Sequence, residues 1–119
     1  TVKENVCLAS QIKGKKVDEK ELNQVLKLLG LEQKKDSFAN ELSGGQQQRV
    51  AIARAILAHT DIILADEPTG NLDGENAKNV MDILKALNKE GKTIVLVTHD
   101  LKVANYADRI IRLEQGKIV

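Results

Sequence analysis

The sequence has few aromatic residues, a single cysteine and no excess of either charge. Aromatic residues make up 2% of the chain and tryptophan is absent, so the core must be built from aliphatic side chains. Cys7 has no partner within the chain, which excludes an internal disulfide and suits a reducing compartment. Lys and Arg number 18 against 17 Asp and Glu, so no cationic excess indicates a nucleic-acid partner.

Long apolar runs are also absent. No stretch reaches the roughly 18 consecutive apolar residues that mark a membrane-spanning helix, so we expect no direct membrane span. The N-terminal residues lack the apolar segment of a secretory signal peptide. The length of 119 residues, of which 42% are hydrophobic, is enough for one modest domain.

The first forty or so residues predict helices and loops. Thr1 is a candidate N-cap for a short opening helix. Asp18 can cap a second helix that ends near Gly30, a residue favoured just after a helix. Four apolar residues at helical spacing form its buried stripe: Leu22, Val25, Leu26 and Leu29. Residues 31–41 are polar and irregular.

From Ser43 onward the pattern predicts alternating helices and strands. Ser43 and Gln46 have the spacing of a capping box and precede a helix that is apolar on nearly all sides, which predicts burial. Continuous apolar runs at 62–65 and 94–97 predict strands covered on both faces. The other elements expected are helices over 75–90 and 101–105 and a pair of strands over 109–113 and 116–119.

This order of elements predicts an α/β fold with a parallel sheet and right-handed crossovers. The strand–helix–strand–helix–strand order occupies the last sixty residues, whereas the first part of the chain is helical. We therefore divide the chain into a helical subdomain, residues 1–42, and a sheet-containing core, residues 43–119.

One motif combines two glycines with a helix start. In Ser43-Gly44-Gly45-Gln46 the glycines allow a close approach of the backbone to a ligand, and a helix N-terminus suits an anion such as phosphate. The alternative is an ordinary serine cap with a flexible entry to the helix.

Three ionisable side chains follow the two predicted strands. Asp66 and Glu67 stand at the carboxyl end of the first strand, the edge where open α/β sheets bind ligands. An Asp there can hold Mg²⁺, and a neighbouring Glu can orient or deprotonate water. His99 lies just past the next strand, at the same edge. Solvated loop carboxylates remain the plainer interpretation of the acidic pair, and His59, without such a context, is taken as structural.

Taken in order, these segments resemble the ATP-binding-cassette (ABC) ATPase family over essentially the whole chain. Leu42 to Gln46 is similar to the signature motif, and Ile62 to Glu67 to the Walker B strand. Asn71 to Asp73 resembles the D-loop, and His99 the switch histidine. The resemblance implies the C-terminal half of a P-loop NTPase core, RecA-like and ABC-type, preceded by an α-helical subdomain.

The resemblance also implies roles for individual residues. Asp66 would serve the Mg²⁺ site, Glu67 would be the general base and His99 would contact the γ-phosphate of ATP. Asp73 would lie at a dimer interface, where it can also simply cap the helix that follows it. The signature residues would grip ATP held by the opposite subunit of a head-to-tail dimer: Ser43, Gly44, Gly45 and Gln46. Transmembrane permease subunits would be further partners, with the ATPase on the cytoplasmic, inner face of the cell membrane.

The phosphate-binding loop of this family is missing from the sequence. Gly91-Lys92-Thr93 is the only Gly-Lys-Thr, but the required first glycine would be residue 86, which is alanine, and the stretch precedes a strand. We interpret it as a turn between helix and strand. The resemblance places the missing strand between 94–97 and 109–113, leaving two unpaired edges. We therefore expect these 119 residues to be part of a longer polypeptide. We also expect that they hydrolyse no ATP by themselves.

The residues around Walker B indicate a branch of the family. Residues 66–73, Asp-Glu-Pro-Thr-Gly-Asn-Leu-Asp, look most like the lipoprotein-release, macrolide-export and antimicrobial-peptide-export branch, as do residues 1–6. This favours the ATP-hydrolysing subunit of an exporter. Two alternatives stay open: an ABC ATPase of the translation-factor or DNA-repair type, and a non-catalytic binding fragment.

Overall fold

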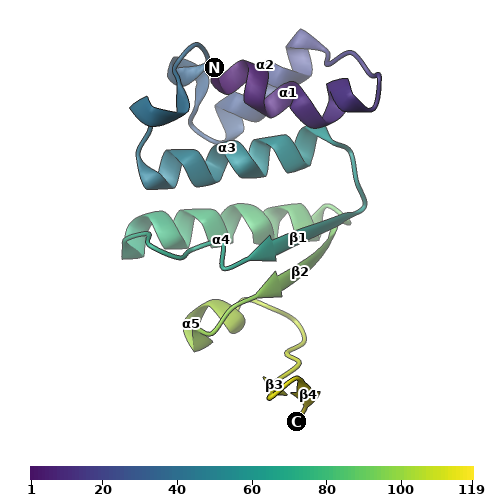
Figure 1. Cartoon of the computed structure of the whole chain (residues 1–119), viewed down its shortest axis with the longest axis vertical. Coiled ribbons are helices and arrows are strands. Elements are labelled where there is room, and N and C mark those ends of the chain that lie inside the picture. The colour runs from purple at the N-terminus through teal and green to yellow at the C-terminus, as the bar shows by residue number, and fades with distance from the viewer.

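The helices and strands stack in layers along the long axis of the molecule, in a computed structural model that describes residues 1–119 (Figure 1). The first layer contains α1 (Val2–Ile12) and α2 (Glu19–Leu28), with short 3₁₀ turns at Glu32–Lys34 and Ala39–Glu41. Next come α3 (Gly44–Leu57) and then the layer of β1 (Ile62–Asp66), α4 (Gly74–Lys89) and β2 (Thr93–Val97). The chain ends with α5 (Leu101–Ala104), β3 (Leu113–Glu114) and β4 (Lys117–Ile118).

Side-chain caps start the helices where the sequence predicted them. Each capping oxygen accepts a backbone N–H in the first helical turn, which satisfies a donor that has no partner within the helix. The predicted caps are confirmed at Thr1, Asp18, Ser43 and Asp73. Gly30 follows α2 with a φ of 68°, a conformation in which glycine has no steric penalty.

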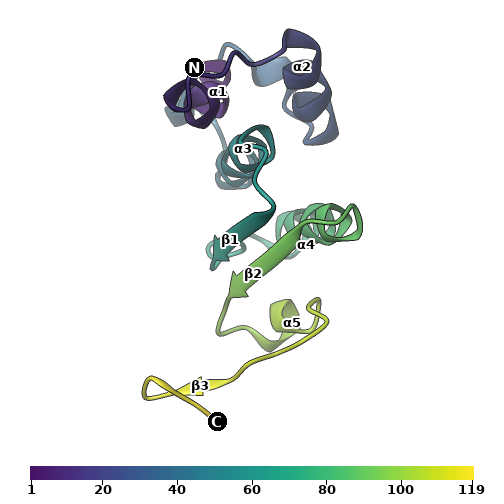
Figure 2. The ribbon, with the colours of Figure 1, turned by 90° about the vertical axis from the view of Figure 1, so that its right-hand side faces the viewer.

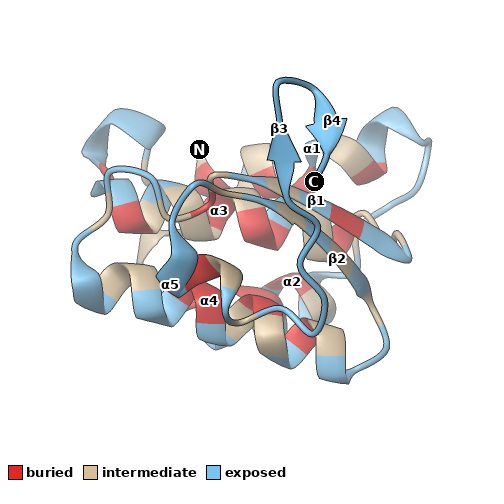
Figure 3. Ribbon diagram, turned by 90° about the horizontal axis from the view of Figure 1, so that it is seen from below, coloured by how far each residue is buried: buried red, intermediate tan, exposed pale blue.

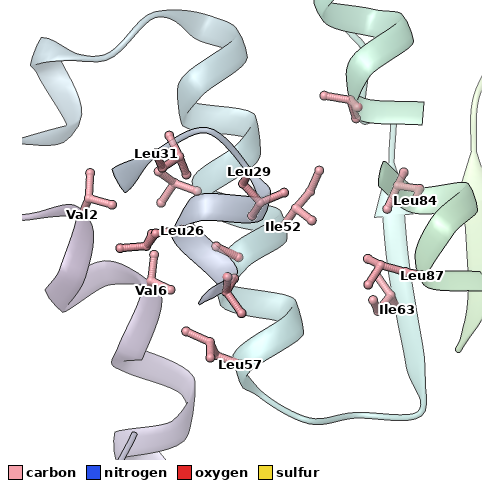
Figure 4. Close-up of a cluster of buried hydrophobic side chains, with 14 of the residues drawn as sticks. Val2, Val6, Leu26, Leu29, Leu31, Ile52, Leu57, Ile63, Leu84 and Leu87 are labelled. Carbon is pink, nitrogen blue, oxygen red and sulfur yellow. The ribbon is translucent and has the colours of Figure 1, made fainter. Parts of the chain in front are cut away.

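Aliphatic side chains form the core, as the shortage of aromatic residues requires (Figure 4). Between α1, α2 and α3, Val6, Leu26 and Leu31 have no exposed surface. A second group lies between β1 and α4, where Ile63 faces Leu87. Helix α3 contacts α1 and α2 on one side and α4 on the other, so the predicted burial of this helix is confirmed.

The strands β1 and β2 form a parallel pair in which Leu64 lies opposite Val95. Helices cover only one face of this pair, because α3 and α4 lie on the same side of it (Figure 2). Ile63 is buried there, whereas Leu64 on the other face is 79% exposed and Val97 is 57% exposed. The prediction that both strands are covered on both faces is therefore wrong: alternate side chains point to opposite faces, and only one face meets a helix.

The pair of strands predicted over 109–113 and 116–119 is present as a shorter hairpin, and the edge of β2 is unpaired, as expected from the missing strand. Residues 109–112 form no strand, and β3 pairs only with β4 as a separate antiparallel hairpin. Its turn residues Gln115 and Gly116 both have positive φ, which suits a two-residue hairpin turn. The hairpin extends away from the helices and is exposed throughout (Figure 3). No strand lies between β2 and this segment to join them in one sheet.

The Gly91-Lys92-Thr93 segment is the predicted turn between α4 and β2. Gly91 has a φ of 106°, and Thr93 already belongs to β2. This segment therefore has neither the position nor the following helix of a phosphate-binding loop. No helix in the chain is both long and apolar enough to cross a membrane.

Two leucines of α2 provide a test of this core. Leu26 is fully buried, whereas Leu28 is 65% exposed. We expect Leu26→Ala to lower the free energy of unfolding by about 3 kcal/mol because it leaves a cavity. The matched control Leu28→Ala should change it by less than about 0.5 kcal/mol. Urea denaturation measures both, and equal effects would contradict the packing of α2 described here.

Candidate functional site

The sequence-predicted site residues gather at one end of the central layers. Strands β1 and β2 run in the same direction, and their carboxyl ends lie on the side where α3 and α4 begin (Figure 1). The loop after β1 and the loop after β2 therefore meet, and the signature segment lies on the adjoining layer. Two groups of side chains result: one centred on Glu67, and one where the start of α3 contacts the start of α4.

Glu67 is held by the loop that follows β2. Its backbone N–H donates to Val97 O at 2.8 Å, which extends the strand pairing by one residue. One carboxylate oxygen accepts the backbone N–H of His99 at 2.9 Å and lies 2.6 Å from His99 Nδ1. The other accepts the Thr98 hydroxyl at 3.2 Å. Glu67 has a φ of 46°, an uncommon backbone conformation for a residue other than glycine that concentrates at functional sites.

These hydrogen bonds favour the ionised form of Glu67. The side-chain bond to His99 is the largest cause of a pKa below the ordinary 4.5, and the bonds from His99 N–H and Thr98 act in the same direction. Partial burial opposes them. The carboxylate is therefore a charged acceptor near neutral pH, to which a water molecule can donate a hydrogen bond.

His99 projects into solvent from this pair, with 91% of its side chain exposed. When Nδ1 donates to Glu67, the neutral ring presents Nε2 as an acceptor, whereas the imidazolium presents it as a donor. His99 can thus contact an anion through Nε2 only in the charged form. The structure brings Glu67 and His99 together, as their positions at neighbouring strand ends predicted.

Asp66 is exposed at the last position of β1 and pairs with Val97 in register. No cluster of three or more His, Cys, Asp or Glu side chains surrounds it. Mg²⁺ is commonly bound through one or two carboxylates, with waters and substrate phosphates completing its octahedron. Asp66 fits such a single-carboxylate role and would hold the ion only together with ligands supplied by a nucleotide and by water.

The signature segment begins α3 with a reciprocal cap. Ser43 Oγ accepts the Gln46 N–H at 3.2 Å, and Gln46 Oε1 accepts the Ser43 N–H at 3.0 Å. This is the predicted capping box. The N–H groups of Gly44 and Gly45 lie in the first turn, where no carbonyl of the helix is available to accept them. Gly44 is exposed and Gly45 is buried, so only the first glycine has open space beside its Cα.

Asp73 is the N-cap of α4, and both of its carboxylate oxygens accept hydrogen bonds from Asn76. Oδ1 accepts the Asn76 backbone N–H at 2.8 Å, and Oδ2 accepts Asn76 Nδ2 at 3.2 Å. The preceding Leu72 lies against the signature segment, 3.7 Å from the place where a Cβ on Gly44 would stand. The capping role of Asp73 is therefore confirmed, and its loop contacts the start of α3 within the same chain.

Three residues of the site were missed by the sequence analysis: Thr98, Asn76 and Arg49. The position of Thr98 could have identified it from the sequence, since it stands between the end of a predicted strand and the candidate catalytic residue His99. Nothing in the sequence identified Asn76 and Arg49, because these two residues meet only when α3 packs against α4.

The fold and this edge define a class of protein. The fold has a helical layer, a capped Gly-Gly helix start and a Glu–His pair at the ends of parallel strands. This combination is that of an ABC-type cassette with the P-loop NTPase fold. Comparison with known proteins agrees, since the ABC transporter family profile matches residues 1–70. The chain belongs to the ABC transporter family.

Among its relatives are macrolide export ATP-binding/permease proteins MacB. The protein of Campylobacter jejuni (strain 81-176) is 51% identical over 121 residues, which cover 100% of this chain and 19% of that protein. That of Haemophilus ducreyi is 55% identical over 97 residues, 82% of this chain and 14% of that protein. The chain thus spans less than a fifth of these relatives.

Solved ABC cassettes share the fold. The dimeric bacterial ABC transporter cassette MJ0796 superposes with a TM-score of 0.85 at 46% identity, covering 99% of this chain and 54% of that one. A post-hydrolysis dimer of the same cassette, bound to ADP and Pi, also has a TM-score of 0.85, with 44% identity. The chain corresponds to about half of each cassette.

The Glu67–His99 contact generates a pH prediction. His99→Ala removes the largest cause of the lowered pKa, so the pKa of Glu67 should rise toward its ordinary value. ¹³C NMR titration of the Glu67 carboxyl carbon measures it, with His59→Ala as the matched control that leaves it unchanged. An unaltered Glu67 titration in His99→Ala would contradict the contact.

The same contact links pH to stability. Because the pKa of Glu67 is lower in the folded chain than in the unfolded one, its contribution to stability is present above the unfolded value and is lost as pH falls through the folded value. His99→Ala should therefore show a smaller loss of stability on acidification below about pH 4.5 than the parent chain. Urea denaturation at a series of pH values measures the difference.

Proposed function

We propose that this chain is the signature-bearing and Walker B-bearing part of an ATP-hydrolysing subunit of an ABC exporter. The observation that carries the proposal is the Glu67 carboxylate, fixed by Thr98 and His99 at the carboxyl end of two parallel strands. Sequence identity with the macrolide export proteins of about one half supports the exporter branch.

In this proposal Glu67 orients the attacking water and receives its proton, while His99 contacts the γ-phosphate of ATP through Nε2. The hydrogen bonds from Thr98 and His99 keep the Glu67 side chain in one orientation, so little reorganisation is needed when water arrives. Mg²⁺, when bound, neutralises charge on the phosphate oxygens. Asp66 contributes one carboxylate to that ion from the end of β1.

The signature segment serves the nucleotide of a second ATPase subunit. Ser43 and Gln46 satisfy each other through the capping box, which leaves the N–H groups of Gly44 and Gly45 for the phosphate oxygens. Asp73 lies beside them on the neighbouring loop. This arrangement supports a head-to-tail dimer in which each subunit completes the site of the other, and the dimeric state of the MJ0796 cassette supports it further.

A phosphate-binding loop must come from outside these residues. The uncovered face of the sheet carries four exposed apolar side chains: Ile62, Leu64, Val95 and Val97. The edge of β2 beside this face is unpaired. Both features support this face and edge as the position of the strand and helix that carry the phosphate-binding loop. Residues 1–42 are proposed as the helical subdomain that abuts the transmembrane permease, and residues 43–119 as the ATPase core. The subunit would act at the cytoplasmic face of the cell membrane.

A chimeric cassette tests the proposal. Replacing the matching part of the dimeric 46%-identical cassette with this chain should give an ATPase. Glu67→Gln should lower its kcat by at least about a hundredfold because the general base is lost. Glu90→Gln, an exposed glutamate at the far end of α4, is the matched control. Without the added half, the chain should show no Glu67-dependent hydrolysis; such activity would contradict the proposal.

Ser43→Ala tests the role of the signature in trans. In the chimera it should reduce turnover while ATP binding to the phosphate loop of the same subunit stays unchanged. Because the substitution also removes a helix cap worth about 1 kcal/mol, Asp18→Ala provides a matched cap deletion away from the site. Equal loss of nucleotide binding and turnover in Ser43→Ala would argue against action on the opposite subunit.

A further inference from the structure

The side chain of Asn76 lies between the start of α4 and the start of α3. Its backbone N–H and its Nδ2 both donate to the Asp73 carboxylate, at 2.8 and 3.2 Å. Its Oδ1 points the other way, toward α3, where it accepts from Arg49 Nη1 at 3.4 Å. The Asn76 amide thus joins the loop that carries Asp73 to the helix that begins with the signature glycines by hydrogen bonds on both sides.

Gly45 makes room for that amide. A Cβ on Gly45 would stand 2.7 Å from Asn76 Oδ1 and 2.9 Å from Asn76 Cγ, distances that side chains do not adopt without moving. Gly44 differs, because the nearest atom to its Cβ position is Leu72 Cδ2 at 3.7 Å, an ordinary contact. The two glycines therefore meet different requirements: one faces a neighbouring side chain and the other is open to solvent.

Arg49 depends on the same amide. Its Nε is buried without a hydrogen-bond partner, and Asn76 Oδ1 is the acceptor that its guanidinium reaches. A partly buried guanidinium with an unpaired nitrogen is costly to hold in place. Loss of the Asn76 amide would leave Arg49 with no acceptor on α4, so the contact aligns the two helices as well as the loop.

We propose that Asn76 is a positioning residue that fixes the Asp73 loop against the signature segment, and that residue 45 is glycine because Asn76 occupies the space of its side chain. The consequence for catalysis rests on the proposed function, since both ends of this contact belong to the half-site that would meet the nucleotide of a second subunit. Asn76 touches no reacting atom and acts through Asp73 and Gly45.

A double-variant cycle in the chain itself tests the contact. Gly45→Ala should lower the folding equilibrium constant about tenfold or more through the clash with Asn76. Asn76→Ala removes Oδ1 and Cγ and leaves only its Cβ, 3.4 Å from the new methyl group, so the double variant should be no less stable than Asn76→Ala. Gly44→Ala should show no such rescue. If Gly45→Ala and Asn76→Ala are simply additive, the proposal is overturned.

NMR of the chain reports on positioning apart from stability. Asn76→Ala should shift the backbone amide signals of both Asp73 and Gly45. It removes the side-chain hydrogen bond to the Asp73 carboxylate and the side-chain atoms that lie beside Gly45. Asn79→Ala, an exposed asparagine three residues along α4, should shift neither. Amide signals at Asp73 and Gly45 that stay in place in folded Asn76→Ala would overturn the positioning role.

The chimeric ATPase gives the catalytic readout. Asn76→Ala should lower kcat about tenfold with little change in the KM for ATP, because the closed site is misaligned while nucleotide binding to the same subunit is intact. If the kcat of Asn76→Ala is unchanged while the stability effects of the Gly45 and Asn76 substitutions are non-additive, Asn76 contributes only to packing. That outcome would overturn its positioning role. Absence of Glu67-dependent hydrolysis would instead contradict the proposed function, and the cycle and NMR measurements would still decide the role of Asn76.

Discussion

The parallel pairing of β1 with β2 is the constraint on which the candidate catalytic group depends. The register sets Asp66 opposite Val97, and the Glu67 N–H continues the ladder by one more bond. That bond, with a positive φ at Glu67, turns the carboxylate toward Thr98 and His99. A strand without its neighbour would leave Glu67 as a solvated loop carboxylate, so the chemistry of the site follows from strand pairing.

The second half of the site depends on helix packing. Helix α3 is buried between α1 and α4, and this sandwich brings its first turn against the first turn of α4. The N-termini of α3 and α4, whose first N–H groups have no acceptor within the helix, then lie side by side. The side chains of Ser43 and Asp73 each accept one of these N–H groups. The close contact of Gly45 with Asn76 sets how near these turns approach.

The β1–β2 pair has one uncovered face and an unpaired edge. Every strand residue that faces α3 or α4 is at least partly buried, whereas the opposite face carries exposed apolar side chains such as Leu64 and Val95. The edge of β2 is unpaired, and the hairpin of β3 and β4 joins neither strand. An apolar face beside an open edge is the surface that a further strand and helix would cover. The match to only about half of each solved cassette agrees with that interpretation.

Local rules sufficed for much of this fold. Helix starts at Thr1, Asp18, Ser43 and Asp73 follow from capping chemistry within three residues, and the apolar runs of β1 and β2 are strong strand signals. The Glu67–His99 pair was predictable because parallel strands end at one edge. The extent of strand burial was not, because a continuous apolar run has the same appearance whether one face is covered or both.

Sequence by itself therefore determined most of the helices and strands, their caps and the family motifs, since these depend on neighbours close along the chain. Only the tertiary structure decided that one face of β1 and β2 stays uncovered, that Thr98 holds Glu67 and that Asn76 fills the space beside Gly45. The last two contacts join residues 31 positions apart along the chain. All three features are set by how the layers pack and by which strands are present to pair.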